Sequence, residues 1–330
     1  MNNDSTSLSI NKTRFSSGAS AFTFGGNGFT IGTGGIDAGA LTSGTETFTP
    51  TITIGNGLQR WNVGAGATIA FGSLGAGADA ADLYTPNGAM VIMSSTGTKT
   101  TTTADGWGWR NGAVAGTGPL GPGMVIDNGD NTYDWASVGT QTAGTSHAIV
   151  AATYTTAANG DAHNVKVTSN TSVSPNGSWA SLLVNGATLT LNGGGSLYLD
   201  TGMILENGGT VAGSAIVKAN ADGLYIYTPD SGTISSSIQN NGSNIKKLYK
   251  AGAGTLTLSG GNSYSAGTIL YAGTLSVGNA SALGSGALTL SGGNLDCSSA
   301  NLTLNNNIAQ NWNKDFTFVG SQNLNLGTGA

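Results

Sequence analysis

The stretch KKLYKAGAGTLTLSGGNSYSAGTILYAGTLSVGNASALGSGALTLSGGNLDCSS (246–299) decides the fold, because its short words return at a nearly constant interval. The word AGTL stands at Ala253–Leu256 and again at Ala272–Leu275. Leu270 and Leu290 are separated by nearly the same interval. A sequence that repeats at a period of about 20 residues is typical of a solenoid, in which each repeat forms one coil.

Apolar and polar residues alternate within these words. Leu256 and Leu258 share one face of an extended segment, and Thr255 and Thr257 share the other. Gly and Asn close each run, and both residue types tolerate the backbone conformations of tight corners. We therefore predict short strands, with each coil supplying one strand to two or three stacked parallel sheets.

The same pattern extends outward from this stretch. ATLTLNGG (187–194) and GALTLSGG (286–293) repeat the central word, and QxWN occurs at 59–62 and at 310–313. Near the N-terminus, short alternating runs place four apolar residues on the expected inward face, namely Phe24, Ile31, Ile54 and Phe71. Both QxWN tryptophans, Trp61 and Trp312, are expected to be structural, since a recurring position reports the repeat.

The rhythm divides the chain into four parts. We expect an N-terminal extension over 1–21, β-helix coils over 22–79, irregular coils or an inserted β subdomain over 80–181, and β-helix coils over 182–330. The last part contains the repeat core 246–299 and is expected to continue beyond the chain end. At about 20 residues per coil, the chain would form about 15 coils.

Composition supports an uncharged, stacked architecture. Of 330 residues, 55 are Gly and only 8% are charged, with a net charge of −5. These values exclude collagen, coiled coils and ordinary cytosolic enzymes, and low charge suits stacked coils because a ladder places like charges over each other. No basic patch suggests nucleic acid, and no run approaches the ~18 apolar residues of a membrane span. Lys246, Lys247 and Lys250 form the only basic cluster, which we interpret as a solvated corner of one coil.

The central stretch closely resembles the autotransporter-associated β-strand repeat, also called the passenger-associated transport repeat. Lys250 is followed by the GxGTLTLSG segment (252–260), then by Asn-x-Tyr and by AGTL with a hydrophobic-Gly-Asn end. The resemblance implies a right-handed parallel β-helix that forms the extracellular passenger of a large secreted bacterial protein. Together with the strand rhythm, we predict an all-β right-handed parallel β-helix with an irregular insertion. It brings no catalytic residues. The positions expected to be structural in the repeat are Gly252, Gly254, Leu256, Leu258, Asn262, Tyr264, Gly273 and Leu275.

Two short segments could bind ligands. Asp127, Asp130 and Asp134 offer oxygen ligands of the kind Ca²⁺ takes, but they lack EF-hand spacing, and Asn128-Gly129 between strand-like runs favours a two-residue hairpin turn without metal. A weak calcium site is the alternative, and no other cofactor is expected.

The segment GWGWR (106–110) is the second candidate. Trp107 and Trp109 would share one face of a strand beside Arg110, and aromatic platforms stack on sugar rings. Packing against the solenoid is the favoured interpretation, and contact with a glycan or a protein partner is the alternative.

We expect a non-catalytic structural or adhesive rod of a bacterial surface or secreted protein, located outside the cell. Its expected partners are glycans or other surface proteins. One alternative is the subunit of an extracellular filament, a homopolymer through the β-helix ends. Another is a polysaccharide-binding or polysaccharide-cleaving β-helix, which would need Asp105, Asp127 or the pair Asp200 and Asp222 to converge with a basic side chain.

Overall fold

The computed structural model describes residues 1–75, 88–94, 96–101, 123–143, 146–160, 162–243 and 246–329. The chain forms two compact units, Met1–Thr153 and Tyr154–Ala330. The described residues are all-β, and their parallel strands stack as a β-solenoid of about 12 turns, which confirms the predicted fold class. The turns are fewer than predicted because many coils are longer than the repeat period of the central stretch. No helix in the described ranges is long and apolar enough to cross a bilayer.

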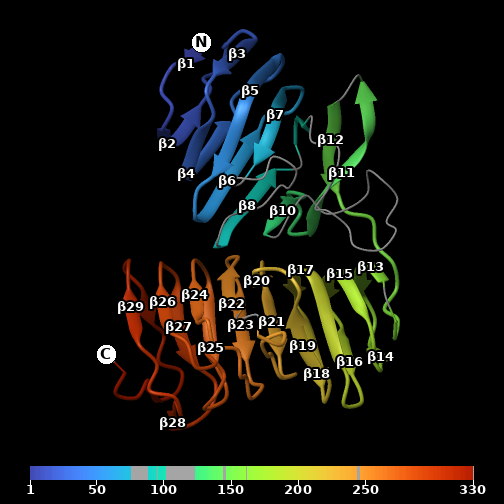
Figure 1. The fold of residues 1–330 in the computed structure, drawn as a ribbon, viewed down its shortest axis with the longest axis vertical. Helices are drawn as coiled ribbons and strands as arrows, with labels where there is room; N and C mark the ends of the chain where they lie inside the picture. Colours follow the sequence, from blue (N-terminus) through green and yellow to red (C-terminus); the bar gives the residue numbers. More distant parts are fainter. Residues whose placement is uncertain are drawn as a thin grey trace. The chain divides into compact units, whose positions relative to one another are not determined.

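The first unit contains two stacks of parallel strands (Figure 1). One stack consists of β1 (Asn2–Asn3), β3 (Phe22–Gly26), β5 (Thr45–Ile54), β7 (Thr68–Gly75) and β9 (Thr98–Thr101). The other consists of β2 (Leu8–Arg14), β4 (Phe29–Ala38), β6 (Gly57–Val63), β8 (Ala89–Ser94) and β10 (Met124–Asp127). Residues 1–21, expected as an extension, thus contribute β1 and β2 to the stacks, because the alternating LSINKTR segment forms a strand.

A hairpin closes both stacks of the first unit. Its strands are β11 (Tyr133–Ala143) and β12 (Ser146–Ala151). β11 pairs antiparallel with β10, and β12 pairs antiparallel with β9, so the last strand of each stack has a partner. Unpaired edge strands invite association with other chains, and this hairpin removes two of them.

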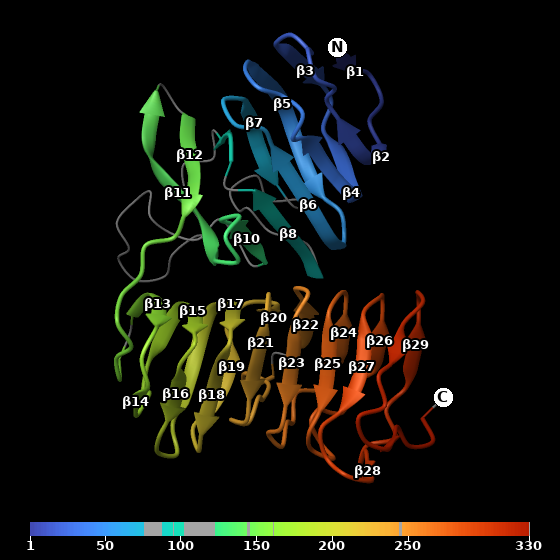
Figure 2. The ribbon, with the colours of Figure 1, turned by 180° about the vertical axis from the view of Figure 1, so that it is seen from behind.

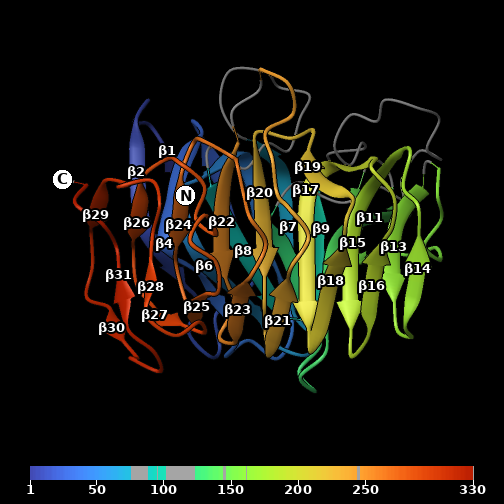
Figure 3. The same ribbon diagram turned by 90° about the horizontal axis from the view of Figure 1, so that it is seen from below.

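The second unit contains two longer parallel sheets (Figures 2 and 3). The first sheet consists of β13 (Ala162–Val167), β15 (Ser178–Asn185), β17 (Ser196–Asn207), β20 (Gly223–Tyr227), β22 (Lys247–Ala251), β24 (Thr268–Leu270), β26 (Leu288–Leu290) and β29 (Gln310–Trp312), with β19 (Ile216–Ala219) beside β17. The second consists of β14 (Thr171–Val173), β16 (Thr188–Leu191), β18 (Gly209–Gly213), β21 (Ser231–Ile234), β23 (Thr255–Leu258), β25 (Thr274–Val277), β27 (Asn294–Cys297) and β30 (Thr317–Phe318). β28 (Leu302–Thr303) and β31 (Leu324–Asn325) pair separately.

The repeats of the sequence stack in register. Leu256 pairs with Leu275, and Leu270 pairs with Leu290, as their spacing predicts. The word GALTLSGG behaves differently, since its strand β26 belongs to the first sheet whereas the TLTL strand β23 belongs to the second. Identical words therefore occupy different sheets, because alternating Leu and Thr suit either sheet equally well.

Each unit has its own hydrophobic core. The first contains aromatic residues from successive coils, and Phe24, Phe48 and Phe71 follow one another with ring centroids 6.1 and 5.9 Å apart. The second core is almost entirely aliphatic. Ile31, Ile54 and Phe71 are buried as predicted, and Phe24 packs against the same core.

The boundary between the units falls at residue 153, inside the segment 80–181. Of that segment, the structure describes strands β8 to β12 in the first unit and β13 to β15 in the second. β13 and β15 are parallel neighbours, so the second solenoid already begins at residue 162 rather than at residue 182.

Candidate functional site

Hydroxyl side chains line the outward side of the sheet from β14 to β30. In β23, Leu256 and Leu258 are fully buried in the core, so Thr255 and Thr257 face outward and are partly exposed. One outward column consists of Thr188, Thr210, Thr233, Thr257, Ser276 and Asp296, of which Ser276 is buried. The next consists of Ser231, Thr255, Thr274, Asn294 and Thr317. We call these two columns the hydroxyl face.

The hydroxyl face is a regular polar lattice with little charge. Neighbours are about 4.8 Å apart across coils and about 6.6 Å apart along a strand. Its one acid, Asp296, accepts hydrogen bonds from the Ser321 backbone N–H at 3.0 Å and from its Oγ at 2.8 Å. Burial disfavours the charged carboxylate, but the hydrogen bonds from Ser321 and from the Cys297 backbone together outweigh it and hold the pKa of Asp296 below its usual value. The face can thus offer hydroxyl donors and acceptors to a neutral polar ligand.

Polar side chains also connect successive coils. Asn262 lies at the centre of such a connection, because its Oδ1 accepts from Ile238 N at 2.8 Å and its Nδ2 donates to Ala282 O at 2.6 Å. Asn262 thereby contacts the coil before it and the coil after it. Tyr264 is 1% exposed, and its hydroxyl lies 2.6 Å from Thr268 Oγ1. Burial raises the pKa of Tyr264 well above its ordinary value.

Glycines form the corner that precedes β23. A Cβ on Gly254 would lie 1.3 Å from Asp230 O in the preceding coil, so no side chain fits there. Gly252 has a φ of +87°, and Gly273, at the equivalent corner of the next coil, has a φ of +70°. Only glycine adopts this conformation readily. Leu275, like Leu256 and Leu258, is fully buried.

The basic cluster is not a solvated corner. Lys250 is 0% exposed, and its Nζ donates to the carbonyl oxygens of Ala251, Gly252, Gly254 and Ala272 at 2.8, 3.0, 3.1 and 3.1 Å. Burial lowers its pKa to about 7. The expectation was wrong because the alternation of β22 places Lys250 on the same inward face as Leu248.

Lys246 and Lys247 differ from each other. Lys246 is also buried, and its Nζ donates to the carbonyl oxygens of Asn220 and Ala221. Burial lowers the pKa of Lys246, although the negative charge of Asp222 works in the opposite direction. Lys247 alone is exposed. The spacing of the lysines therefore does not describe one surface patch.

Each unit also contains a buried glutamate. Glu46 and Glu206 are 0% exposed, and their carboxyl oxygens have no partner within hydrogen-bond distance among the described residues. Burial raises the pKa of both carboxyl groups, that of Glu206 strongly, while the nearby Phe22 backbone opposes the shift at Glu46. In the first unit, Lys99 follows two coils after Glu46, and its Nζ donates to the carbonyl oxygens of Ser94 and Thr96. Burial lowers the pKa of Lys99 to about 8.

The acidic turn forms a hairpin with a longer loop than predicted. β10 and β11 pair through Asp127 and Tyr133, so residues 128–132 make the connection. Side chains of the turn stabilise this longer loop. The Asp127 carboxylate accepts a hydrogen bond from Gly129 N, and the Asp130 carboxylate accepts one from Thr132 N, both at 3.0 Å.

The three carboxylates of this hairpin have protein partners. Asp127 also accepts from Arg60 at 3.1 Å, and Asp134 accepts from the Asn128 amide at 3.0 Å. Within the described ranges, no group of three or more His, Cys, Asp or Glu side chains could hold a metal ion. The weak calcium site at Asp127, Asp130 and Asp134 stays a prediction.

The other candidate residues are those of the GWGWR segment and the aspartates Asp105, Asp200 and Asp222. Trp107, Trp109 and Arg110, like Asp105, lie outside the described residues. Asp200 accepts from Ser178 at 3.1 Å and from Asn220 at 2.6 Å, which are neighbours in adjacent coils. Asp222 accepts from the Tyr225 hydroxyl at 3.0 Å.

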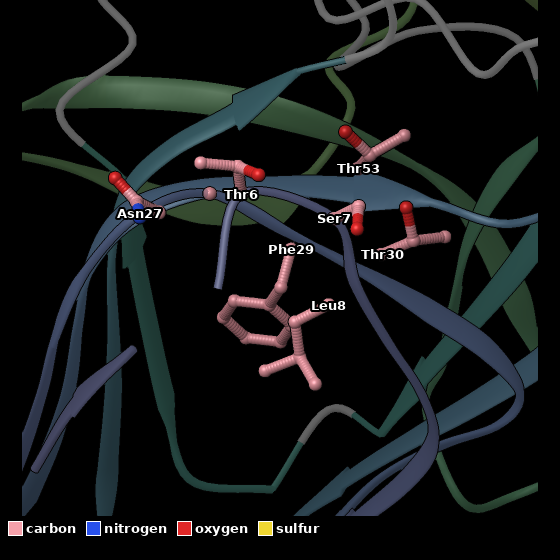
Figure 4. A pocket seen from close by; sticks show the side chains of 8 residues that line it. Thr6, Ser7, Leu8, Asn27, Phe29, Thr30 and Thr53 are labelled. Atoms are coloured by element: carbon pink, nitrogen blue, oxygen red, sulfur yellow. The ribbon is translucent and has the colours of Figure 1, made fainter. Parts of the chain in front are cut away.

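A depression of about 590 Å³ lies on the first unit (Figure 4). Thr6, Ser7, Asn27, Thr30 and Thr53 contribute polar atoms to its lining, and Leu8 and Phe29 lie side by side beneath them. The lining contains no charged side chain, so it resembles the hydroxyl face in chemistry.

Residues 248–277 match the family model of the passenger-associated-transport repeat. The match lies inside the predicted core 246–299 and spans β22 to β25, including Lys250, the glycine corner, Asn262 and Tyr264. Neither the curated proteins nor the solved structures yield a significant match. The matched repeat and the β-solenoid together fit an autotransporter-passenger-like repeat protein.

Proposed function

We propose that this chain is a non-catalytic structural or adhesive part of a bacterial surface or secreted protein. The passenger-associated repeat carries this proposal, because it is seated in register within a stacked solenoid. Passenger regions of this kind lie outside the cell. The hydroxyl face supports an adhesive role, since an ordered array of uncharged donors and acceptors suits glycans or polar protein surfaces.

Localisation is tested with an antibody against this chain on intact and lysed cells of the producing bacterium. We expect the antigen on intact cells or in the medium, and protease added outside the cells should remove the surface fraction. Antigen confined to the cytoplasm after lysis would contradict the proposal.

Adhesion is tested by the binding of the purified chain to immobilised glycans and to host-surface proteins. The double variant Thr233→Lys/Thr257→Lys places two cations on the hydroxyl face and should reduce binding about tenfold. Thr289→Lys is the matched control, since Thr289 faces outward from β26 in the other sheet. Equal binding by the double variant and the control would argue against the hydroxyl face.

End-to-end assembly into a filament is the second candidate. The last described coil exposes three large apolar side chains, Trp312 at 64%, Phe318 at 45% and Val319 at 51%. A coil of a second copy stacked on β29 and β30 would cover them and pair their edges. Light scattering tests this candidate, since a monomer at high concentration would contradict it and Trp312→Lys should abolish any polymer.

Cleavage of a polysaccharide by the purified chain would overturn the non-catalytic assignment.

A further inference from the structure

Lys250 occupies a position that belongs to the hydrophobic core. In register it pairs with Ile226 in the preceding coil and with Leu270 in the following one, and both are fully buried. The column to which it belongs is otherwise aliphatic from Leu182 to Leu290, with Ile204, Ile226 and Leu270 between them. An ammonium group therefore stands where the repeat could place a leucine.

The ammonium group is satisfied by backbone oxygens alone. Three of its acceptors, the carbonyls of Ala251, Gly252 and Gly254, belong to the corner of its own coil. The fourth, the carbonyl of Ala272, belongs to the next coil. No ion pair to a carboxylate involves Lys250 within the described part of the chain. Its hydrogen bonds thus join two consecutive coils at one point.

The glycine corner makes this arrangement possible. Gly252 has a φ of +87°, and Gly254 lies against the backbone of Asp230, so the corner has no bulky side chain. Its carbonyl oxygens can therefore converge on one point inside the coil. The same residues that make the corner tight also create the cage of acceptors.

The apolar core by itself does not fix how these coils stack. The strand segments TLTL (255–258) and TLSV (274–277) alternate with a period of two. A slip of one residue would turn the leucines outward, but a slip of two residues keeps apolar residues inward and hydroxyls outward. Two registers that bury the same residue types differ little in hydrophobic free energy.

We propose that Lys250 sets the register between its own coil and the coil that follows, because the acceptor from the next coil, the Ala272 carbonyl, meets the ammonium group in one register only. A buried polar group that is satisfied in a single arrangement disfavours the alternatives. Burial lowers the pKa of Lys250 to about 7, so the folded state disfavours its charge. This cost is consistent with a residue that serves specificity rather than maximal stability.

Engineered disulfides can distinguish the registers. Thr257 and Ser276 are register partners, so their Cα atoms lie about 4.8 Å apart, within the range that a disulfide bridges. Thr257 and Thr274 are displaced by two residues and lie about 8 Å apart, beyond that range. In a Cys297→Ser background, Thr257→Cys/Ser276→Cys reports the native register and Thr257→Cys/Thr274→Cys reports the slipped one.

Cross-linking of each cysteine pair is measured in the protein that retains Lys250 and in the Lys250→Met variant. Lys247→Met is the matched control, because Lys247 is exposed in the same strand. With Lys250, we expect cross-linking of the native pair only. With Lys250→Met, cross-linking of the slipped pair should rise about tenfold, the factor that corresponds to about 1.4 kcal/mol of lost discrimination. The control should behave like the parent.

Two results would overturn the proposal. One is exclusive native cross-linking in a folded Lys250→Met variant. The other is complete unfolding of both Lys250→Met and Lys250→Gln, judged by circular dichroism, because the lysine would then be a requirement for stability and not a determinant of register.

Discussion

The two units of this protein build parallel coils from different materials. In the first unit the step between register partners grows along the chain, and the step from Trp61 to Met93 is much longer than the step from Leu8 to Phe29. In the second unit the steps vary less, as the pairs Ile234 with Leu258 and Leu256 with Leu275 show. Glycines with positive φ occur in both units, but the more regular steps accompany a mainly aliphatic core, whereas the irregular steps accompany a core with many aromatic rings.

The comparison relates the regularity of coil length to the type of residue that fills the core. Where the coils differ less in length, leucines and other aliphatic residues fill most of the interior. Where the coils vary in length, stacked rings such as Phe48 over Phe71 fill a less regular interior, with 16° between their planes. Among the described residues, both units nevertheless contain a buried glutamate whose carboxyl oxygens have no hydrogen-bond partner and, two coils later, a buried lysine whose Nζ donates to carbonyl oxygens.

Gly254→Val should break the regular unit most severely. Its Cβ would meet Asp230 O at 1.3 Å, so the corner cannot close and the coil must separate from its neighbour. We expect a loss of more than about 4 kcal/mol in the free energy of unfolding.

Gly261→Ala is the control, because nothing lies within 4 Å of its Cβ position. Urea unfolding followed by circular dichroism measures both, and a stable Gly254→Val variant would show that the corner is adaptable.

Phe48→Ala tests the aromatic core of the first unit. Phe48 is 2% exposed and contacts the rings of Phe24, Phe29 and Phe71, so truncation should lower the free energy of unfolding by about 3–5 kcal/mol.

In the second unit, Leu275→Phe should lower the free energy of unfolding by about 1–3 kcal/mol, because the larger ring overpacks the coil. If Leu275→Phe were neutral, the difference between the two interiors would not be one of coil width.

Glu206→Gln should stabilise the second unit in a pH-dependent way. The folded-state pKa of Glu206 is raised by burial, so the stability associated with its neutral form is complete below pH 4.5 and is lost as pH rises through the folded pKa. The variant should therefore gain about 1–2 kcal/mol over the parent at pH 8 and almost nothing at pH 4. Equal effects at both pH values would assign the gain to packing. Glu46→Gln makes the same comparison in the first unit.

Asn207→Ala should have the smallest effect of this series. The Asn207 amide donates to Asn185 Oδ1 at 2.9 Å in the preceding coil, at a partly buried site. Losing one such neutral hydrogen bond should cost about 0.5–1.5 kcal/mol. Thermal unfolding provides the measurement, and Thr188→Ala in β16 of the other sheet is the control. A much larger loss of stability would mean that the hydrogen bond between Asn207 and Asn185 acts cooperatively with its neighbours.

The stacking could be predicted from the sequence because it depends on local pattern. The interval between Leu270 and Leu290 equals one coil, and period-two alternation places both leucines inward whatever the surroundings. The chemistry of the outer face followed from the same alternation, since the threonines between leucines must face outward. The repeat motif itself was recognisable from its letters.

Side-chain environment was harder to predict, as the two QxWN words show. Trp61 is 1% exposed and donates to Gln59 Oε1 at 3.0 Å, but Trp312 is 64% exposed. Trp61 pairs with Met93 in the following coil, whereas no described strand follows β29 in its sheet.

The sequence by itself determined that this chain is a sparsely charged parallel solenoid with glycine corners, because periodicity and corner chemistry are properties of neighbouring residues. Only the tertiary structure decided that Lys250 is a core residue, that β11 and β12 close the first pair of stacks, and that one word serves two sheets. These features depend on which backbone atoms from distant coils meet. A lysine is a surface residue by default, and four converging carbonyl oxygens make this one an exception.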